Sequence, residues 1–378
     1  MEGASAKRRG IRGFLFSSQG WPYMLVPFIP LAVVFEFAHA SATLIFAVAA
    51  LGIVPTAALM GLATEELAAR SGPGIGGFLN VTFGNAPEII IAVFALNAGL
   101  QEVVKASIAG SILGNILLVL GASMFIGGLK RDKQTFNQTA ATAQSTMLLL
   151  AVAALLMPAI FVLVQGDGLP PIGAELVEYD STVEKLSLAT AFVLIGTYVA
   201  GLIFSLKTHR DLFNPPYAEQ EEHGFGWSVR RSVIMLAIAG VAVGLMSEIL
   251  VGSISEASEA IGLSEFFVGV IVVAIVGNAA EHWVAVLMAM KNKMDLAVNI
   301  AIGSSAQIAL FAAPLLVVAS FFLGPSPMPL VFNGFELGAV LVAILIANYV
   351  TQDGESTWFE GVQLLAVYVI LAIAFFAA

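Results

Sequence analysis

Residues 84–88 read Gly-Asn-Ala-Pro-Glu, and residues 277–281 read Gly-Asn-Ala-Ala-Glu. The two copies lie 193 residues apart (277 − 84), and the same offset carries Gly110-Ser111 onto Gly303-Ser304. Self-similarity at one fixed offset indicates an internal repeat. We therefore expect the two halves of the chain to share one folding plan.

The composition around these copies is typical of a membrane protein. Hydrophobic residues make up 59% of the 378 residues and charged residues only 11%, whereas soluble chains carry about 25% charged residues. The chain has no cysteine, which excludes disulfides and thiolate metal sites. Its net charge of −10 argues against nucleic acid as a partner. The predicted partner is the lipid bilayer, and homo-oligomer formation stays open.

Eleven apolar runs approach or exceed the ~20 residues that a helix needs to cross a bilayer. They are residues 22–38, 42–63, 75–98, 105–128, 139–165, 186–206, 229–250, 265–290, 296–323, 328–350 and 357–377. With a cytoplasmic N-terminus, 14 of the 16 Lys and Arg residues fall on the cytoplasmic side, and only Lys105 and Lys185 do not. The sequence predicts an all-α polytopic protein with eleven transmembrane helices and a C-terminus opposite the N-terminus. A prokaryotic cell membrane and an organellar membrane both fit.

The repeat also divides the chain. Residues 1–38 hold a basic flank and one extra helix, residues 39–206 and 229–378 hold five helices each, and residues 207–228 form a cytoplasmic acidic linker. Because five is an odd number of crossings, the second repeat is inverted relative to the first, as in secondary transporters with ion sites near the bilayer midplane. We interpret the acidic linker either as a solvated connector or as a cation sensor.

Both motif copies fall in the middle of predicted helices. An ionisable side chain there costs roughly 2.5–3.5 kcal/mol or more, which makes Glu88 and Glu281 the main candidate site. Asn85 and Asn278 precede them by three residues, a spacing that places amide and carboxylate on one helix face. We expect these four residues to bind a cation and protons.

Further candidate side chains surround the two motifs. Pro87 is expected to kink its helix and to free the carbonyl of Phe83 for a cation. Residues predicted to line the pathway are Ser111, Asn115, Ser304, Ser305, Gln307 and His282. Hydrogen bonding between helices is the alternative interpretation for these polar residues, and packing is the alternative for His282. Glu66 and Glu259 match across the offset and are interpreted as entrance residues or as solvated helix ends.

The chemistry of this set favours one kind of substrate. Carboxylates, amide oxygens and hydroxyls are hard-oxygen ligands that suit Ca2+ as a transported ion, and no organic cofactor is implied. Two close carboxylates also bind protons, because repulsion and desolvation favour the protonated form when no cation is present. The chain has neither a P-loop nor a His-Glu-x-x-His motif, which argues against a nucleotide-driven pump and an intramembrane metalloprotease. The sequence predicts a secondary transporter and not an enzyme.

Four segments carry a resemblance to a known family. They are Asn-Val-Thr-Phe-Gly-Asn-Ala-Pro-Glu at 80–88, Gly-Ser-Ile-Leu-Gly-Asn at 110–115, Val-Gly-Asn-Ala-Ala-Glu-His at 276–282 and Gly-Ser-Ser-Ala-Gln at 303–307. The chain resembles, over nearly all its length, the cation/proton exchanger (Ca2+/H+ antiporter) branch of the calcium/cation antiporter superfamily. Pro87 stands where this branch more often has threonine.

The resemblance implies that Glu88 and Glu281 bind Ca2+ and protons alternately and that Asn85 and Asn278 assist them. It also implies that the pathway is lined by Ser111, Asn115, Ser304 and Gln307. Alternating access between the two inverted repeats is the expected mechanism. The alternative function is an Na+/Ca2+ exchanger, or an exchanger of another divalent cation, from the same superfamily.

Overall fold

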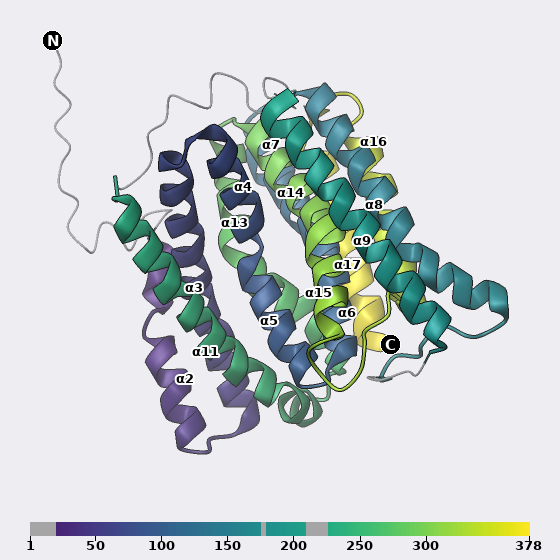
Figure 1. Ribbon diagram of the computed structural model, residues 1–378. Helices are drawn as coiled ribbons and strands as arrows, with labels where there is room; N and C mark the ends of the chain where they lie inside the picture. The colour runs from purple at the N-terminus through teal and green to yellow at the C-terminus, as the bar shows by residue number, and fades with distance from the viewer. Residues whose placement is uncertain (1–19, 175–178, 209–225) are drawn as a thin grey trace, which may run out of the picture.

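The computed structural model describes residues 20–174, 179–208 and 226–378, and most of them are helical (Figure 1). The predictions for the basic flank at residues 7–12 and for the acidic run at residues 219–222 lie outside the described residues. Two short strands, β1 (Gln134–Thr135) and β2 (Glu355–Ser356), are the β-structure of the described part of the chain.

The helices before the acidic linker overlap the first six predicted apolar runs. They are η1 (Trp21–Leu25), α2 (Phe28–Phe37), α3 (Ala42–Arg70), α4 (Gly72–Gly84), α5 (Ala86–Asn97), α6 (Gln101–Leu113), η2 (Gly114–Val119), α7 (Leu120–Gly128), α8 (Gln138–Gln165), α9 (Ser181–Ile203) and η3 (Phe204–Thr208).

The helices after the linker overlap the other five runs. They are α11 (Val229–Ile261), α12 (Glu265–Phe267), η5 (Val268–Val273), α13 (Ala274–Met290), α14 (Met294–Gln307), η6 (Ile308–Ala312), α15 (Ala313–Ser320), α16 (Gly334–Val350) and α17 (Trp358–Ala377).

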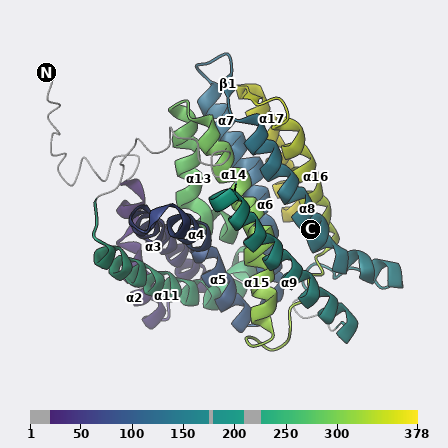
Figure 2. The same ribbon diagram turned by 45° about the horizontal axis from the view of Figure 1, so that its top comes forward.

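The lengths of these helices make the chain a multi-pass membrane protein. Among the described residues, eight helices are long and apolar enough to cross a bilayer, and three shorter apolar helical segments accompany them at Trp21–Phe37, Ala86–Asn97 and Gly334–Val350. The continuous helix Gln101–Gly128 lies at the centre of the bundle, because 89% of its most apolar 18 residues are buried, against 22% for Trp358–Ala377. In both views α2, α3 and α11 lie together on one side of the bundle, and α8, α9 and α16 lie on the other (Figures 1 and 2).

The connecting loops gather at the two ends of this central helix. At its C-terminal end β1 pairs with β2, Lys133 Nζ lies 2.6 Å from Glu355 Oε1, and Gln134 Nε2 donates to the Ala289 carbonyl at 2.9 Å. At its N-terminal end Gln101 Nε2 donates to the Ser326 carbonyl at 2.9 Å. The loops after α7, α13 and α16 therefore meet at one end, and those after α5 and α15 meet at the other.

The structure corrects the prediction of one continuous helix over residues 75–98. α4 ends at Gly84, Asn85 adopts φ −96° and ψ 18°, and α5 begins at Ala86 with Pro87 in its first turn, where proline is favoured. The Phe83 carbonyl accepts a hydrogen bond from the Asn85 N–H, so the prediction that it stands free for a cation is wrong. In the second copy Ala280 replaces the proline, and α13 runs unbroken through the motif.

Two π-helical segments follow the motifs at matching places. η2 covers Gly114–Val119 and η6 covers Ile308–Ala312, and the offset of 193 carries residues 114–119 onto 307–312. Asn115 lies inside the first segment, and Gln307 directly precedes the second. Such π-bulges are rare and occur frequently at functional sites.

Candidate cation site

Each motif glutamate packs against the glycine of the other motif copy. A Cβ atom built on Gly277 would lie 3.2 Å from Glu88 Cγ, and one built on Gly84 would lie 3.4 Å from Glu281 Oε1. A Coulombic interaction also links Glu88 to Glu281. The structure therefore brings together the two glutamates that the sequence motifs pair, and the contact is tighter at Gly277 than at Gly84.

Hydrogen bonds between the two halves of the chain hold the motif asparagines. Asn85 Nδ2 donates to Gln307 Oε1 at 2.7 Å, and Asn278 Nδ2 donates to Ser111 Oγ at 3.1 Å. Asn278 Nδ2 also donates to the Ala274 carbonyl at 2.9 Å. The amide nitrogens make these bonds, whereas the side-chain oxygens of both asparagines have no hydrogen-bond partner.

The two motif asparagines and Glu88 each have a buried oxygen atom without a hydrogen-bond partner in the structure: Asn85 Oδ1, Asn278 Oδ1 and Glu88 Oε2. Leaving a buried acceptor unsatisfied costs about 1–3 kcal/mol, so native proteins rarely do it without a functional reason. All three are hard oxygen atoms of the kind that bind Ca2+ or Mg2+. A bound cation would satisfy them.

The two carboxyl groups differ in how they are held. Ser304 Oγ donates to Glu281 Oε2 at 2.9 Å, whereas Glu88 Oε2 has no such partner. The hydroxyl of the next residue, Ser305, donates at 3.0 Å to the Ala301 carbonyl within its own helix. Ser304 thus contacts Glu281, whereas the Ser305 hydroxyl is hydrogen-bonded within α14.

His282 lies one residue beyond Glu281 and contacts the opposite half of the chain. Its Nε2 atom lies 3.1 Å from Asn115 Oδ1 in η2, and since an amide oxygen only accepts, the imidazole donates. This bond agrees with the interpretation of His282 and Asn115 as interhelical contacts. The proton-relay interpretation of His282 stays a prediction.

The two matched acidic residues at the helix ends differ in burial. Glu66 is only 4% exposed, and its Oε2 atom accepts a hydrogen bond from the Trp227 N–H at 2.8 Å. Its interpretation as a solvated helix end is therefore wrong, since it holds the chain where α11 begins. Glu259 lies exposed in the last turn of α11.

Charged residues that the two motifs do not mark occur in two further places. Glu65, the neighbour of Glu66, is exposed and interacts electrostatically with Glu281. The internal repeat does not mark Glu65 as a candidate, because the offset of 193 pairs it with Ser258, which is not acidic. Near the N-terminal end of the central helix, Glu102, Lys105 and Glu336 are buried, with exposed fractions of 5%, 5% and 2%. Lys105 Nζ donates to the Val331 carbonyl at 3.2 Å, which no spacing in the sequence reveals.

Across the described residues, no three His, Asp or Glu side chains gather at a single point. A divalent ion at the motifs would therefore take two carboxylates and draw its remaining oxygen ligands from amides, hydroxyls or water. A mixed shell of this kind is common for Ca2+, whose ligands include amide carbonyls and water as well as carboxylates.

The chain matches one protein family and close relatives over most of its length. The sodium/calcium exchanger protein family matches residues 41–207 and 231–377, which include both motif copies. The Ca2+/H+ antiporter of Synechocystis sp. is 44% identical over 373 residues, covering 93% of this chain and 96% of the relative. The Ca2+/H+ antiporter ChaA of Bacillus subtilis is 46% identical over 351 residues, covering 92% of this chain and 96% of the relative.

Solved structures share the fold. Native YfkE superposes with a TM-score of 0.79 at 42% identity, covering 94% of this chain and 100% of that chain. The H+/Ca2+ exchanger CAX superposes with a TM-score of 0.69 at 16% identity, covering 96% of this chain and 93% of that chain. At the lower identity the likeness concerns the fold alone.

Proposed function

The chain belongs to the Ca2+/H+ antiporter branch of the sodium/calcium exchanger family, and we propose that it exchanges Ca2+ for H+ as a secondary active transporter. The observation that carries the proposal is the reciprocal packing of Glu88 on Gly277 and of Glu281 on Gly84. This packing gives one site two carboxyl groups, one from each half of the chain.

The proposed ligands of Ca2+ are the two carboxylates and the unpartnered amide oxygens. Glu88 Oε2, Asn85 Oδ1 and Asn278 Oδ1 are buried and unpaired, and Glu281 is positioned by Ser304. Ca2+ takes 6–8 oxygen ligands in flexible geometry, so serine hydroxyls and water complete the shell. In this role Gln307 and Ser111 act indirectly, by orienting the two asparagines.

Exchange follows from charge balance at this site. Two carboxylates are neutralised either by one Ca2+ or by two protons, and the doubly charged empty site is costly to carry through the hydrocarbon region. The site therefore changes its exposure only when loaded with Ca2+ or with protons. Coupled antiport results, with at least two protons for each Ca2+.

Alternating access is proposed to use two inverted five-helix repeats, residues 39–206 and 229–378, behind a first extra helix. The matching positions of η2 and η6 support the repeat. The gathering of the loops after α7, α13 and α16 at one end supports eleven crossings, because that topology assigns all three loops to one face. The basic residues of these loops favour the cytoplasm for this face and for the N-terminus.

Transport by the purified protein in sodium-free liposomes tests this function. An outward proton gradient should drive uptake of Ca2+, and a trapped pH dye should report proton efflux that depends on external Ca2+. Replacing Ca2+ by Mn2+, Mg2+ or Na+ in turn defines the substrate range. Ca2+ uptake that requires Na+ and leaves the pH dye unchanged would instead indicate Na+/Ca2+ exchange.

A further inference from the structure

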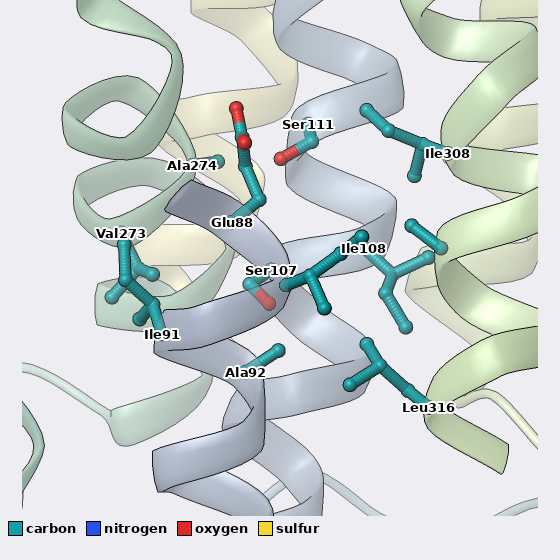
Figure 3. A pocket seen from close by; sticks show the side chains of 12 residues that line it. Glu88, Ile91, Ala92, Ser107, Ile108, Ser111, Val273, Ala274, Ile308 and Leu316 are labelled. Carbon is teal, nitrogen blue, oxygen red and sulfur yellow. The ribbon is translucent and has the colours of Figure 1, made fainter. Parts of the chain in front are cut away.

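A small pocket adjoins Glu88 and is lined by residues of α5, α6, η5, α13, η6 and α15 (Figure 3). Its volume is about 20 Å³, and its polar lining consists of Glu88, Ser107 and Ser111. The rest of the lining is apolar and includes Ala92 and Leu316. Figure 3 shows Glu88 and Ser111 at one end of the pocket, Ala92 and Leu316 at the other, and Ser107 between them. The pocket thus runs from the carboxyl group toward the end of the bundle where α5 and α15 finish.

The pocket has the size and polarity that one water molecule requires. A cavity needs about 10–15 Å³ to hold a water, which then makes two to four hydrogen bonds. Ser111 Oγ accepts from Asn278, so the hydroxyl hydrogen of Ser111 remains available. Ser107 Oγ donates to the Val104 carbonyl at 2.9 Å, so its oxygen remains available as an acceptor. Glu88, Ser107 and Ser111 thus supply the polar groups of the pocket.

The same pocket is unsuited to Ca2+. The ion takes 6–8 oxygen ligands at about 2.3–2.6 Å, and this lining offers one carboxyl group and two hydroxyls. The remaining walls are hydrocarbon, which cannot replace the lost hydration shell of a divalent ion. Entry of Ca2+ by this route would therefore require an almost bare ion.

We propose that this pocket is a one-water chamber through which solvent, but not Ca2+, reaches Glu88. The inference rests on the proposed function only in treating Glu88 as the cation-binding carboxylate. Solvent and Ca2+ then reach Glu88 from different directions. Ser107 becomes a water-positioning residue that no sequence motif marks.

The absence of cysteine from the chain permits a direct test with single thiols. In Ser107→Cys, the small ion Ag+ should react with the thiol. The bulky cationic reagent MTSET should react with this thiol at least about tenfold more slowly than with an exposed thiol, since a steric cost of about 1.4 kcal/mol already slows a reaction tenfold. In the control Gly168→Cys, on an exposed loop with open space around it, both reagents should react. Saturating Ca2+ should leave the Ag+ reaction of Ser107→Cys unchanged.

Three results of this labelling would overturn the proposal: MTSET reacting with Ser107→Cys as fast as with Gly168→Cys, no reaction of Ser107→Cys with either reagent, or full protection by Ca2+. The labelling measures the accessibility of the thiol at position 107 and not transport, so its result is informative even if the protein does not exchange Ca2+ for H+. The proposed function and this inference therefore fail separately.

A pocket-filling variant provides a second readout. Ala92→Val adds two carbon atoms to the lining and should lower the exchange rate about tenfold while the Ca2+-induced thermal shift is retained, because solvent must contact the carboxylate during exchange. Ala95→Val, one turn further along α5 and also buried, lies outside the lining and should keep the exchange rate. Full exchange by a folded Ala92→Val protein would contradict the inference.

Discussion

Asn85 Nδ2 donates a hydrogen bond to Gln307 Oε1 at 2.7 Å, across 222 residues of sequence. Asn85 is the residue at which the first motif leaves the helical conformation, and Gln307 immediately precedes the π-helical segment of the second half. The bond therefore connects the two irregular points of the helices that carry the candidate site. It also fixes the direction of Asn85 Oδ1, which has no other partner.

This bond predicts non-additive effects on Ca2+ binding. Gln307→Ala should weaken binding by about 1 kcal/mol, about fivefold in Kd, because the Asn85 amide loses its orientation. Asn85→Ala should weaken it further, and the double variant should bind as Asn85→Ala does. Titration calorimetry on the four proteins measures the coupling. Strictly additive effects would show that Gln307 does not act through Asn85.

The glycines of the two motifs should differ in their tolerance of a methyl group. A Cβ at Gly277 meets Glu88 Cγ at 3.2 Å, which is tighter than ordinary contact, whereas a Cβ at Gly84 meets Glu281 Oε1 at 3.4 Å. Overpacking costs about 1–3 kcal/mol, so Gly277→Ala should reduce the rate of exchange more than Gly84→Ala does. Initial rates in proteoliposomes give the comparison. The opposite order would contradict the packing described for Glu88.

Ser304 and Ser305 form a matched pair of neighbouring hydroxyls. Ser304→Ala removes the hydrogen bond to Glu281, and bonds to charged groups contribute about 1.5–3 kcal/mol, so Ca2+ affinity should fall about tenfold or more. Ser305→Ala removes a bond within α14 and should leave the affinity near that of the wild type. Equal losses in the two variants, measured by Ca2+ titration, would argue against the anchoring of Glu281 by Ser304.

Gly110 and Gly303 occupy matching positions in the repeat but should respond differently to substitution. A Cβ at Gly110 would collide with the backbone carbonyl of Val270, whereas a Cβ at Gly303 would have its nearest neighbour, Asn299 Oδ1, at 3.6 Å. Gly110→Ala should therefore strongly lower thermal stability, because α6 and η5 must separate, and Gly303→Ala should be tolerated. Size-exclusion chromatography after heating measures both, and equal stability would contradict the close approach of Gly110.

Much of the architecture could be predicted from the sequence. The hydrophobic runs predict the helices, because a helix that crosses a bilayer needs a long apolar segment. The two motif copies make Glu88 and Glu281 candidate site residues, because an ionisable side chain within the membrane is energetically costly and usually functional. The prediction that amide and carboxylate share one helix face holds for Asn278 and Glu281 in α13, whereas Asn85 lies at the break between α4 and α5.

Other features depend on tertiary contacts between residues that lie far apart in the sequence, and no local sequence pattern predicts such contacts. The break at Asn85 results from Pro87 beginning a new helix instead of kinking an old one. The partnership of Asn85 with Gln307 and the burial of Lys105 depend on helices that meet only after folding. The π-helical segments have no pattern of hydrophobicity that distinguishes them from α-helix.

The central claim is that Glu88 and Glu281 together exchange Ca2+ for protons. Glutamine has nearly the same shape as glutamate but cannot release a proton, so Glu88→Gln and Glu281→Gln should preserve the packing against Gly277 and Gly84. The decisive measurement is simultaneous Ca2+ uptake and proton efflux in sodium-free proteoliposomes that contain either variant. We predict that both fluxes disappear in each variant while the protein still inserts and remains folded. Coupled exchange that persists in either variant would contradict the account.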